Sequence, residues 1–503
     1  MAAYRGMSLP VVVLLAFALI GCGGGSSNAS SNVQFAPAPT GPFTNASFSG
    51  QYAFMVTGAN TSGFFALAGS LQADGNGNIV SGVEDVNSAG GTFSSVPITG
   101  TYSVSADGRG VAVLTPTNGS FNGVTLDFVL ISSQRALVTR FDTVASASGT
   151  LDLQNSTYFS ASALSGQFAF NLSGVDSTVA PLQTVGMWQS DGASKLSNGT
   201  LDTNDNGTFS TTSLTGSYTV GSSNGRGIAT LNTSPFGTIS VVFYIVDQYR
   251  LRLVGANSTP LLAGSAYSQQ GLSNVAPGSY AYTVAGGTTA SGPYVAGGVF
   301  TINNSGTVAT GVQDSNSNGS VQQNLSLTGL YTSTGSGRDA LTLTTGVGTT
   351  NFVVYPSLQG QSQMRLLMLE KDSTPISFGA AFPQQPVTYS NASIQGNFGY
   401  NLDGAFSNGV QTDAIAHLSA DGNGGFSGAL STLDWNIGGV LWRGLLFEGN
   451  YAMASNGRGT ATLQNGLGSS YTQDFVLYQV NSSQVLLIEV DSGLIAVGDM
   501  EQQ

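Results

Sequence analysis

The sequence predicts an all-β protein made of four tandem antiparallel units of about eight strands each. Apolar and polar residues alternate with a period of two, clusters of Gly, Asn, Asp and Ser recur about every 8 to 12 residues, and no segment shows a helical period. The 69 glycines among 503 residues indicate many turns and little helix. A hydrophobic fraction of 41% suffices for folded cores, so the low charge does not indicate disorder.

The first unit illustrates the strand prediction. Eight candidate strands lie near residues 50–57, 64–73, 77–84, 92–105, 109–115, 123–132, 135–142 and 148–154. The first alternates as Gln51-Tyr52-Ala53-Phe54, and Asp74-Gly75-Asn76-Gly77 makes a hairpin turn between the second and the third. The turn Ala106-Asp107-Gly108-Arg109 separates the fourth from the fifth, and the sixth and seventh are strongly apolar.

Sequence anchors that recur in the same order define the four units. A Gly-x-aromatic-small-aromatic segment repeats with a period of 112 to 118 residues, at Gly50–Phe54, Gly166–Phe170, Gly278–Tyr282 and Gly396–Tyr400. A Gly-x-Tyr pair follows in each unit and ends at Tyr102, Tyr218, Tyr331 and Tyr451. Since a shared core demands such repetition, we expect these aromatic residues to pack in the core; lining a ligand cavity is the alternative.

Eight sequential strands in about 110 residues resemble small up-and-down barrels of the lipocalin or avidin type, in which closure removes exposed strand edges. β-Sandwiches are the alternative, and strand alternation alone also permits one large outer-membrane barrel. The expected units span residues 46–157, 162–270, 274–386 and 391–503.

The N-terminal segment predicts export. Arg5 precedes an apolar run from Leu9 to Ile20, which is the order of regions in a secretory signal and too short to span a bilayer as a helix. The run ends Leu19-Ile20-Gly21-Cys22 and so resembles the lipobox of bacterial lipoproteins. That resemblance implies removal of the signal peptide 1–21 and lipidation of Cys22, the only cysteine; an ordinary secretory signal is the alternative.

The expected location follows from this segment. Residues 22–45 contain the lipidated Cys22 and a Gly/Ser/Asn/Pro-rich stretch that predicts a flexible tether. We therefore expect a protein anchored by lipid to the outer membrane or cell surface, and Gly23 in place of an Asp is compatible with the outer-membrane sorting of lipoproteins. A net charge of −13 makes nucleic acid an improbable partner.

Each unit carries an arginine after a glycine in the same turn, namely Arg109, Arg226, Arg338 and Arg458. A cation at one fixed place in a chain with only 8% charged residues is a candidate ligand-binding group for a carboxylate or sulfate. We nevertheless expect a hairpin arginine that bonds a neighbouring loop or closes a barrel end, and ligand binding is the alternative.

An Asp-x-Asn pattern also recurs in every unit. In the middle units it extends to six residues that resemble the first half of an EF-hand calcium loop, with candidate ligands Asp202, Asn204, Asn206, Asp314, Asn316 and Asn318. The glutamate that would end such a loop is replaced by Ser213 and Leu325, and Asn and Asp are ordinary turn residues. We therefore expect plain turns and no cofactor; calcium binding is the alternative.

The composition disfavours catalysis. His417 is the only histidine, and the lipidated Cys22 is the only cysteine, so histidine-dependent triads and histidine-rich metal sites have little support. A carboxylate pair for glycoside hydrolysis needs no histidine. The fourth unit has acids near Trp435 and Trp442, namely Asp421, Asp434, Glu448, Asp474 and Glu489.

We therefore expect a non-catalytic binding, adhesive or structural repeat array on the membrane. Neutral polar side chains suit carbohydrate or another surface polymer, and tandem copies raise avidity. The alternatives are a carrier of small apolar ligands in barrel cavities and a polysaccharide-active enzyme that uses carboxylates of the fourth unit.

Overall fold

The computed structural model describes residues 41–234, 236–272, 275–360, 363–385, 388–428, 430–467 and 472–503. The expected signal peptide, Cys22 and most of the tether lie outside the described residues. No described helix is both long and apolar enough to cross a membrane. The described chain is almost entirely antiparallel β-strand, as predicted.

Consecutive strands pair along the chain and close into barrels. Barrel 1 contains β1 (Ser49–Asn60), β2 (Gly63–Asp74), β3 (Asn78–Ser88), β4 (Gly91–Val104), β5 (Arg109–Pro116), β6 (Val124–Ser132), β7 (Arg135–Phe141) and β8 (Ala145–Leu153). Barrel 2 contains β9 (Gly166–Val175), β10 (Pro181–Ser190), β11 (Lys195–Asp205), β12 (Thr208–Val220), β13 (Arg226–Thr233), β14 (Gly237–Ile245), β15 (Arg250–Gly255) and β16 (Leu261–Ser268).

Barrels 3 and 4 repeat this order with one strand divided in each. Barrel 3 contains β17 (Gly278–Thr288), β18 (Gly292–Ile302), β19 (Thr307–Ser317), β20 (Ser320–Ser326), β21 (Thr328–Thr332), β22 (Asp339–Thr345), β23 (Gly348–Leu358), β24 (Met364–Glu370) and β25 (Ser377–Pro383). Barrel 4 contains β26 (Gln395–Phe406), β27 (Gln411–Asp421), β28 (Gly425–Phe426), β29 (Thr432–Ile437), β30 (Val440–Met453), β31 (Arg458–Asn465), β32 (Thr472–Asn481), β33 (Gln484–Glu489) and β34 (Leu494–Gln502).

In every barrel the first strand pairs with the last: β1 with β8, β9 with β16, β17 with β25 and β26 with β34. These pairings satisfy the edge strands, which is the up-and-down barrel predicted from the sequence. The unit boundaries expected from the sequence, at residues 46–157, 162–270, 274–386 and 391–503, stay predictions.

Large aromatic side chains fill the barrel interiors. In barrel 1, Tyr52, Phe54 and Phe128 are all but fully buried in one apolar cluster. The ring of Phe54 occupies the space beside Gly69, where a Cβ atom would lie only 2.4 Å from the ring. A side chain at position 69 would therefore displace the ring, which is why glycine belongs there.

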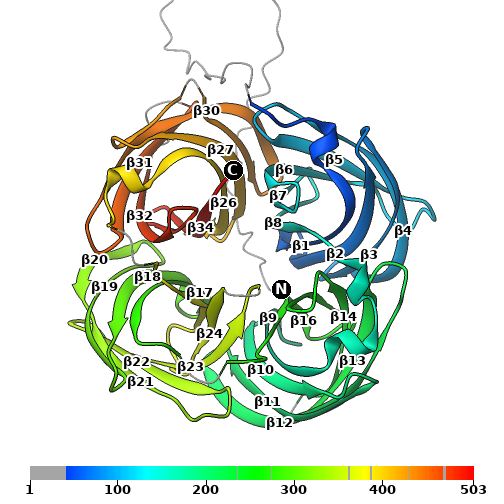
Figure 1. The fold of residues 1–503 in the computed structure, drawn as a ribbon, viewed down its shortest axis with the longest axis horizontal. Helices are drawn as coiled ribbons and strands as arrows, with labels where there is room; N and C mark the ends of the chain where they lie inside the picture. The colour runs from blue at the N-terminus through cyan, green and yellow to red at the C-terminus, as the bar shows by residue number, and fades with distance from the viewer. Residues whose placement is uncertain are drawn as a thin grey trace, which may run out of the picture.

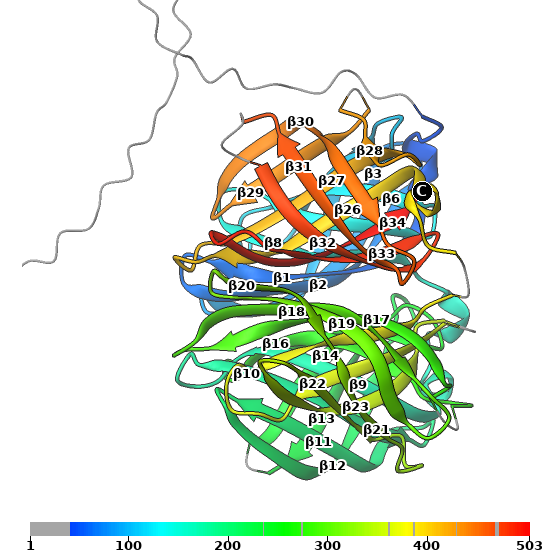
Figure 2. The same ribbon diagram turned by 90° about the vertical axis from the view of Figure 1, so that its left-hand side faces the viewer.

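The four barrels form a ring in which each contacts two neighbours (Figure 1). A view turned by 90° brings barrels 3 and 4 to the front (Figure 2). Each junction has a small apolar patch, for example Ala53, Val83 and Tyr244 between barrels 1 and 2. Between barrels 4 and 1 the patch contains Ile415, Val129 and Leu137, so the last barrel packs on the first.

Candidate binding chamber at the centre of the ring

The repeated arginines lie at the junctions between barrels. Arg226 of barrel 2 forms two hydrogen bonds, of 2.8 and 2.7 Å, with the carboxylate of Asp85 in barrel 1. Arg338 binds Asp202 in the same way, and Arg458 binds Asp314. These bidentate pairs each join one barrel to the next, so three of the four candidate ligand-binding arginines are engaged with the protein itself.

A tyrosine completes each of these three junctions. The hydroxyl groups of Tyr244, Tyr355 and Tyr478 donate to Asp85, Asp202 and Asp314 respectively. The carboxylates that the sequence offers as calcium ligands are thus surrounded by donors from the neighbouring barrel. A cation ligand would need those oxygen atoms free.

The asparagines of the Asp-x-Asn pattern hold the next barrel by its backbone. The amide of Asn204 donates to the carbonyl groups of Glu370 and Asp372, both at 2.9 Å. Asn316 donates to Asp491, and Asn87 and Asn436 make equivalent bonds across their own junctions. Asn206 and Asn318 lie in left-handed turn conformation, with φ of 46° and 47°. Among the described residues no group of three His, Cys, Asp or Glu side chains is arranged to hold a metal.

The junction from barrel 4 to barrel 1 has its ion pair reversed. Here barrel 4 supplies the cation, and Arg443 binds Asp127 of barrel 1 with distances of 2.9 and 2.5 Å. Arg109, the fourth repeated arginine, instead binds Asp107 of its own turn at 2.7 Å. Val129 occupies the place that Tyr244 has in barrel 2, since each pairs with its barrel's repeated arginine.

A cavity of about 390 Å³ lies where the four barrels meet. We call it the chamber; its walls come from the first, seventh and eighth strands of all four barrels, which are β1, β7, β8, β9, β15, β16, β17, β24, β25, β26, β33 and β34. Its volume is in the range of small-molecule sites in proteins.

The chamber walls are pseudo-symmetric. Arg135, Arg250 and Arg365 occupy one equivalent position on the seventh strands, and Gln484 occupies it in barrel 4. Together with Arg252 they place four of the eleven arginines around one cavity. Such a gathering of charge is unusual for a chain in which 8% of residues are charged.

Three of the four arginines share one carboxylate. Asp152, which is fully buried, lies 2.8 Å from Arg135, 3.2 Å from Arg250 and 2.5 Å from Arg252. Burial opposes ionisation of this carboxyl group, but the three guanidinium groups hold its pKa well below its usual range. Asp152 is therefore an anion that fixes three cations at the chamber wall.

Arg365 has no such partner. No described carboxylate lies within salt-bridge distance of its guanidinium group, and its buried Nε lacks a hydrogen-bond acceptor. The guanidinium carbon lies 4.3 Å from the ring centre of Tyr267 and 5.1 Å from that of Phe382, so two aromatic faces hold it. Although burial opposes the change, Arg365 and Arg252 lower the pKa of Tyr267 to about 8, which indicates a strongly positive environment.

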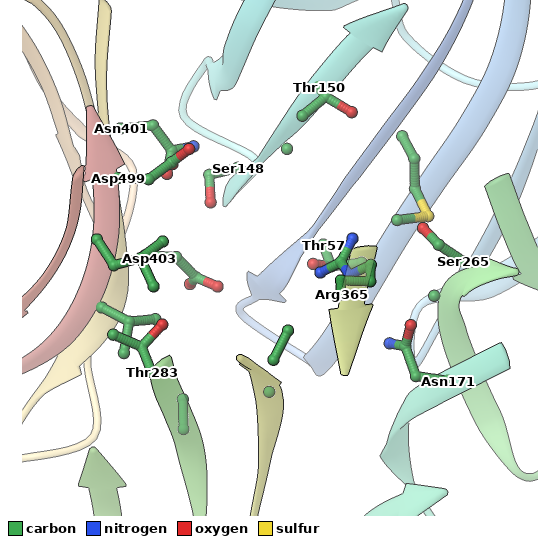
Figure 3. Close-up of a pocket in the computed structure, with 18 of the residues that line it drawn as sticks. Thr57, Ser148, Thr150, Asn171, Ser265, Thr283, Arg365, Asn401, Asp403 and Asp499 are labelled. Carbon is green, nitrogen blue, oxygen red and sulfur yellow. The ribbon is translucent and has the colours of Figure 1, made fainter. Parts of the chain in front are cut away.

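Barrel 4 gives the opposite wall its acids. Glu501 binds Arg135 through two bonds of 2.6 Å. Burial and the charge of Glu501 raise the pKa of Asp499 well above its usual range. Burial also raises the pKa of Asp403 to about 6. Figure 3 shows Asp403, Asp499 and Asn401 together on one side of the chamber, apart from Arg365.

The acids considered for catalysis in barrel 4 are dispersed. Asp421 accepts hydrogen bonds from the backbone of its own turn, Asp434 accepts from Gly444 and Glu489 is buried. The indole of Trp435 is buried and donates to Thr412. His417 is buried, and its Nδ1 lies 2.7 Å from the Leu430 carbonyl oxygen. These residues do not converge on a cleft, so the polysaccharide-active alternative gains no support.

The alternative of a carrier for small apolar ligands in barrel cavities gains no support either. The apolar cavity inside barrel 2, lined by Phe168, Trp188 and Phe243 among others, has a volume of about 10 Å³. That space is at the lower limit for one water molecule and far below that of a small apolar ligand.

Sequence reasoning did not find the chamber. A signal was present, because Arg135 and Arg250 begin the strand that follows the strongly apolar sixth strand of their unit, and Arg365 is the second residue of the equivalent strand. Comparing units at that position would have shown an arginine in three copies out of four.

No family model matches the chain, and no curated protein matches it. Among solved structures, the chain is similar to isotype 1 transferrin binding protein B from serogroup B Neisseria meningitidis, with 8% identity, 74% of this chain and 84% of that chain covered, and a TM-score of 0.22. It is also similar to a Trp-176-Ala mutant of transferrin binding protein B from Haemophilus parasuis Hp5, with 9% identity, coverage of 74% and 83%, and a TM-score of 0.20. A third match is intact Ap-TbpB with its N and C lobes, at 9% identity, coverage of 94% and 99%, and a TM-score of 0.20. Scores this low carry no inference about function.

Proposed function

We propose that this protein is an exported, lipid-anchored, non-catalytic binding protein, and that the chamber binds its ligand. The observation that carries this proposal is the gathering of four arginines and several carboxyl groups around one cavity. Residues of all four barrels line the cavity, so the ring as a whole builds one site.

Energetics support a binding role for the chamber. Charged groups lose hydration when they are buried, and a well-packed apolar contact often stabilises a protein as much as a buried ion pair does or more. Stability alone would therefore favour an apolar centre. Binding of a polar ligand that pairs with these charged groups would account for their presence at the ring centre.

The contacts favour one shared site over four equal ones. The repeated Arg226, Arg338 and Arg458 side chains bind neighbouring barrels, so they are not free to bind a surface polymer at each unit. The avidity model required such independent sites. Carbohydrate remains a partner suggested by composition alone.

The test is a thermal-unfolding screen of the mature protein against small anions, cations, zwitterions and neutral sugars. A ligand that binds the native state raises the unfolding temperature. We would compare the wild type with Thr283→Trp, which fills the chamber, and with Val113→Trp on an exposed strand position. A shift present in the wild type and V113W but absent in T283W supports the proposal. Equal shifts in all three proteins, or none across the panel, contradict it.

Anchoring is tested separately. The full chain would be expressed in a bacterial host with labelled palmitate, beside Cys22→Ser. We expect label and membrane association in the wild type and neither in C22S, because Cys22 is the only cysteine. An unlabelled wild-type protein in the soluble fraction would refute the lipid anchor.

A further inference from the structure

We infer that the ligand of the chamber is a small zwitterion, whose anionic group binds Arg365 and whose cationic group binds the Asp403–Asp413 pair. The inference rests on the proposed function, because it names the ligand class of the same site. Most charged groups of the chamber are already paired within the protein, and the ligand class follows from those that are not.

The cationic wall has one free charge. Arg135 is bound to Asp152 and Glu501, Arg252 is bound to Asp152, and Arg250 also binds Asp247 at 2.8 Å. Arg365 alone has no carboxylate partner among the described residues: it lies against the rings of Tyr267 and Phe382, hydrogen-bonds with Tyr267, and keeps an acceptor-free Nε. Burial and the neighbouring charges of Arg252 and Arg135 lower the pKa of Arg365, so an anion that enters beside it would be strongly favoured.

The acidic wall has one free charge as well. Glu501 is neutralised by Arg135, and burial and the charge of Glu501 disfavour ionisation of Asp499 beside it. Asp403 and Asp413 form the other carboxyl pair: Gln411 donates to both, at 2.8 and 3.3 Å, and Ser146 donates to Asp413 at 2.5 Å. No arginine or lysine among the described residues forms a salt bridge with either acid.

The state of this pair follows from its burial. Asp413 is fully buried, and its Oδ1 has no hydrogen-bond partner in the described chain. Burial and the charge of Asp403 raise the pKa of Asp413 well above its usual range, while that of Asp403 rises to about 6. Because the two carboxyl groups share Gln411 and lie in one buried site, they titrate as a pair, and an ionised pair carries negative charge at this wall. That charge lacks a cation.

The space between the two charges suits a short polar molecule. Hydroxyl and amide side chains line it, among them Thr57, Ser148, Asn171 and Thr283 in Figure 3. Arg365 comes from barrel 3 and Asp403 from barrel 4. A molecule with opposite charges at its ends satisfies both groups, whereas a singly charged one leaves the other group unpaired and desolvated, which is costly.

The experiment is calorimetric titration of the mature protein with straight-chain ω-amino acids from glycine to 6-aminohexanoate. Each is paired with the carboxylic acid that lacks the amine and with the amine that lacks the carboxylate. We expect one chain length to bind best, at least about tenfold more tightly than either matched compound. Arg365→Gln and Asp403→Asn should each weaken that binding by about tenfold or more, while Lys195→Gln on the exposed surface should not.

Arg365→Lys keeps the positive charge and therefore serves as a control for a folding defect. The affinity of this variant for the best ω-amino acid should lie between those of the wild type and R365Q. The unfolding temperature of every variant is measured alongside. Equal binding of a matched carboxylic acid overturns the zwitterion and leaves the proposed function intact. If no ω-amino acid binds but another class of compound in the thermal screen does, the zwitterion inference is likewise overturned and the proposed function stands. Failure of the entire screen removes both proposals.

Discussion

The side-chain amide of Gln503 donates to the carbonyl oxygen of Leu130 at 2.7 Å, and thereby joins barrel 4 to barrel 1. Three further glutamines make the same contact at the other junctions, where Gln154, Gln269 and Gln384 each donate to two backbone carbonyl groups of the following barrel. The glutamine contact is thus the same at all four junctions, although the ion pair of the fourth is reversed, and the ring is closed by specific bonds.

Gln503→Ala should weaken ring closure. It removes the donor from the carbonyl groups of Leu130 and Asp107, at a cost of about 1 kcal/mol because both bonds are partly buried. Calorimetric unfolding should show a lower midpoint, and hydrogen exchange should rise around β5 and β6. Gln502→Ala is the control, since Gln502 bonds Gln395 of its own barrel at an exposed site. Equal effects of the two changes would contradict a closing role for Gln503.

Asp202→Asn should destabilise the junction of barrels 2 and 3. It leaves the guanidinium group of Arg338 without its anion, and breaking a buried pair of this kind costs about 3 kcal/mol or more. The midpoint of thermal unfolding measures the loss. Asp205→Asn, three residues away in β11 and without a salt bridge among the described residues, should change it little. A D202N protein as stable as D205N would remove the structural role given to the pair.

Glu84→Gln should change how stability depends on pH. Glu84 is fully buried in barrel 1, neither carboxyl oxygen has a described partner, and burial raises its pKa to about 8. Between the unfolded value of 4.5 and about 8, the native state keeps a proton that the unfolded state has released, so stability falls as pH rises. The slope from this group is about 1.4 kcal/mol per pH unit.

Denaturant unfolding from pH 5 to pH 8 checks this prediction. E84Q has no proton to lose, so its stability should decline less over that range than the wild-type value does. Glu448→Gln, at an exposed position, should follow the wild type. A wild-type slope that E84Q retains in full would show that other groups cause it.

Calcium should not stabilise the protein. The oxygen atoms of Asp202 already accept from Arg338 and Tyr355, and those of Asp314 accept from Arg458 and Tyr478. A cation there would have to displace a guanidinium group from a bidentate pair. Unfolding temperatures in millimolar calcium and in EGTA should therefore agree. A calcium-dependent rise that D202N abolishes would restore the metal site suggested by the sequence.

Much of the fold could be predicted because local patterns determine it. The candidate strands 64–73 and 123–132 of the first unit correspond to β2 (Gly63–Asp74) and β6 (Val124–Ser132), since alternation and turn residues mark the strand limits. The repeated tyrosines pack in the cores as expected; Tyr102, for example, is 5% exposed and donates to the Phe48 carbonyl group.

The site could not be predicted in the same way. The partner of Arg226 is Asp85, which lies 141 positions earlier in another unit, and no local pattern indicates how the barrels are arranged. Arg365 faces the chamber only because four barrels close around it. The sequence singled out the repeated arginines beside glycine, whereas the arginines at the chamber lie at or near the starts of the seventh strands and did not form an obvious motif.

The reversed pair of Arg443 and Asp127 affects how separate chains meet. At the other three junctions an aspartate on one barrel binds the repeated arginine of the next barrel. If the fourth junction had the same order, the aspartate of barrel 4 could bind the repeated arginine of any barrel in another molecule. Head-to-tail contacts that do not close produce filaments. With the polarity reversed, the free edge of barrel 4 matches barrel 1 alone, which the tandem chain supplies at high local concentration. The exception to the repeat thus favours pairing of barrel 4 with barrel 1 over pairing with barrel 2 or barrel 3 of another molecule.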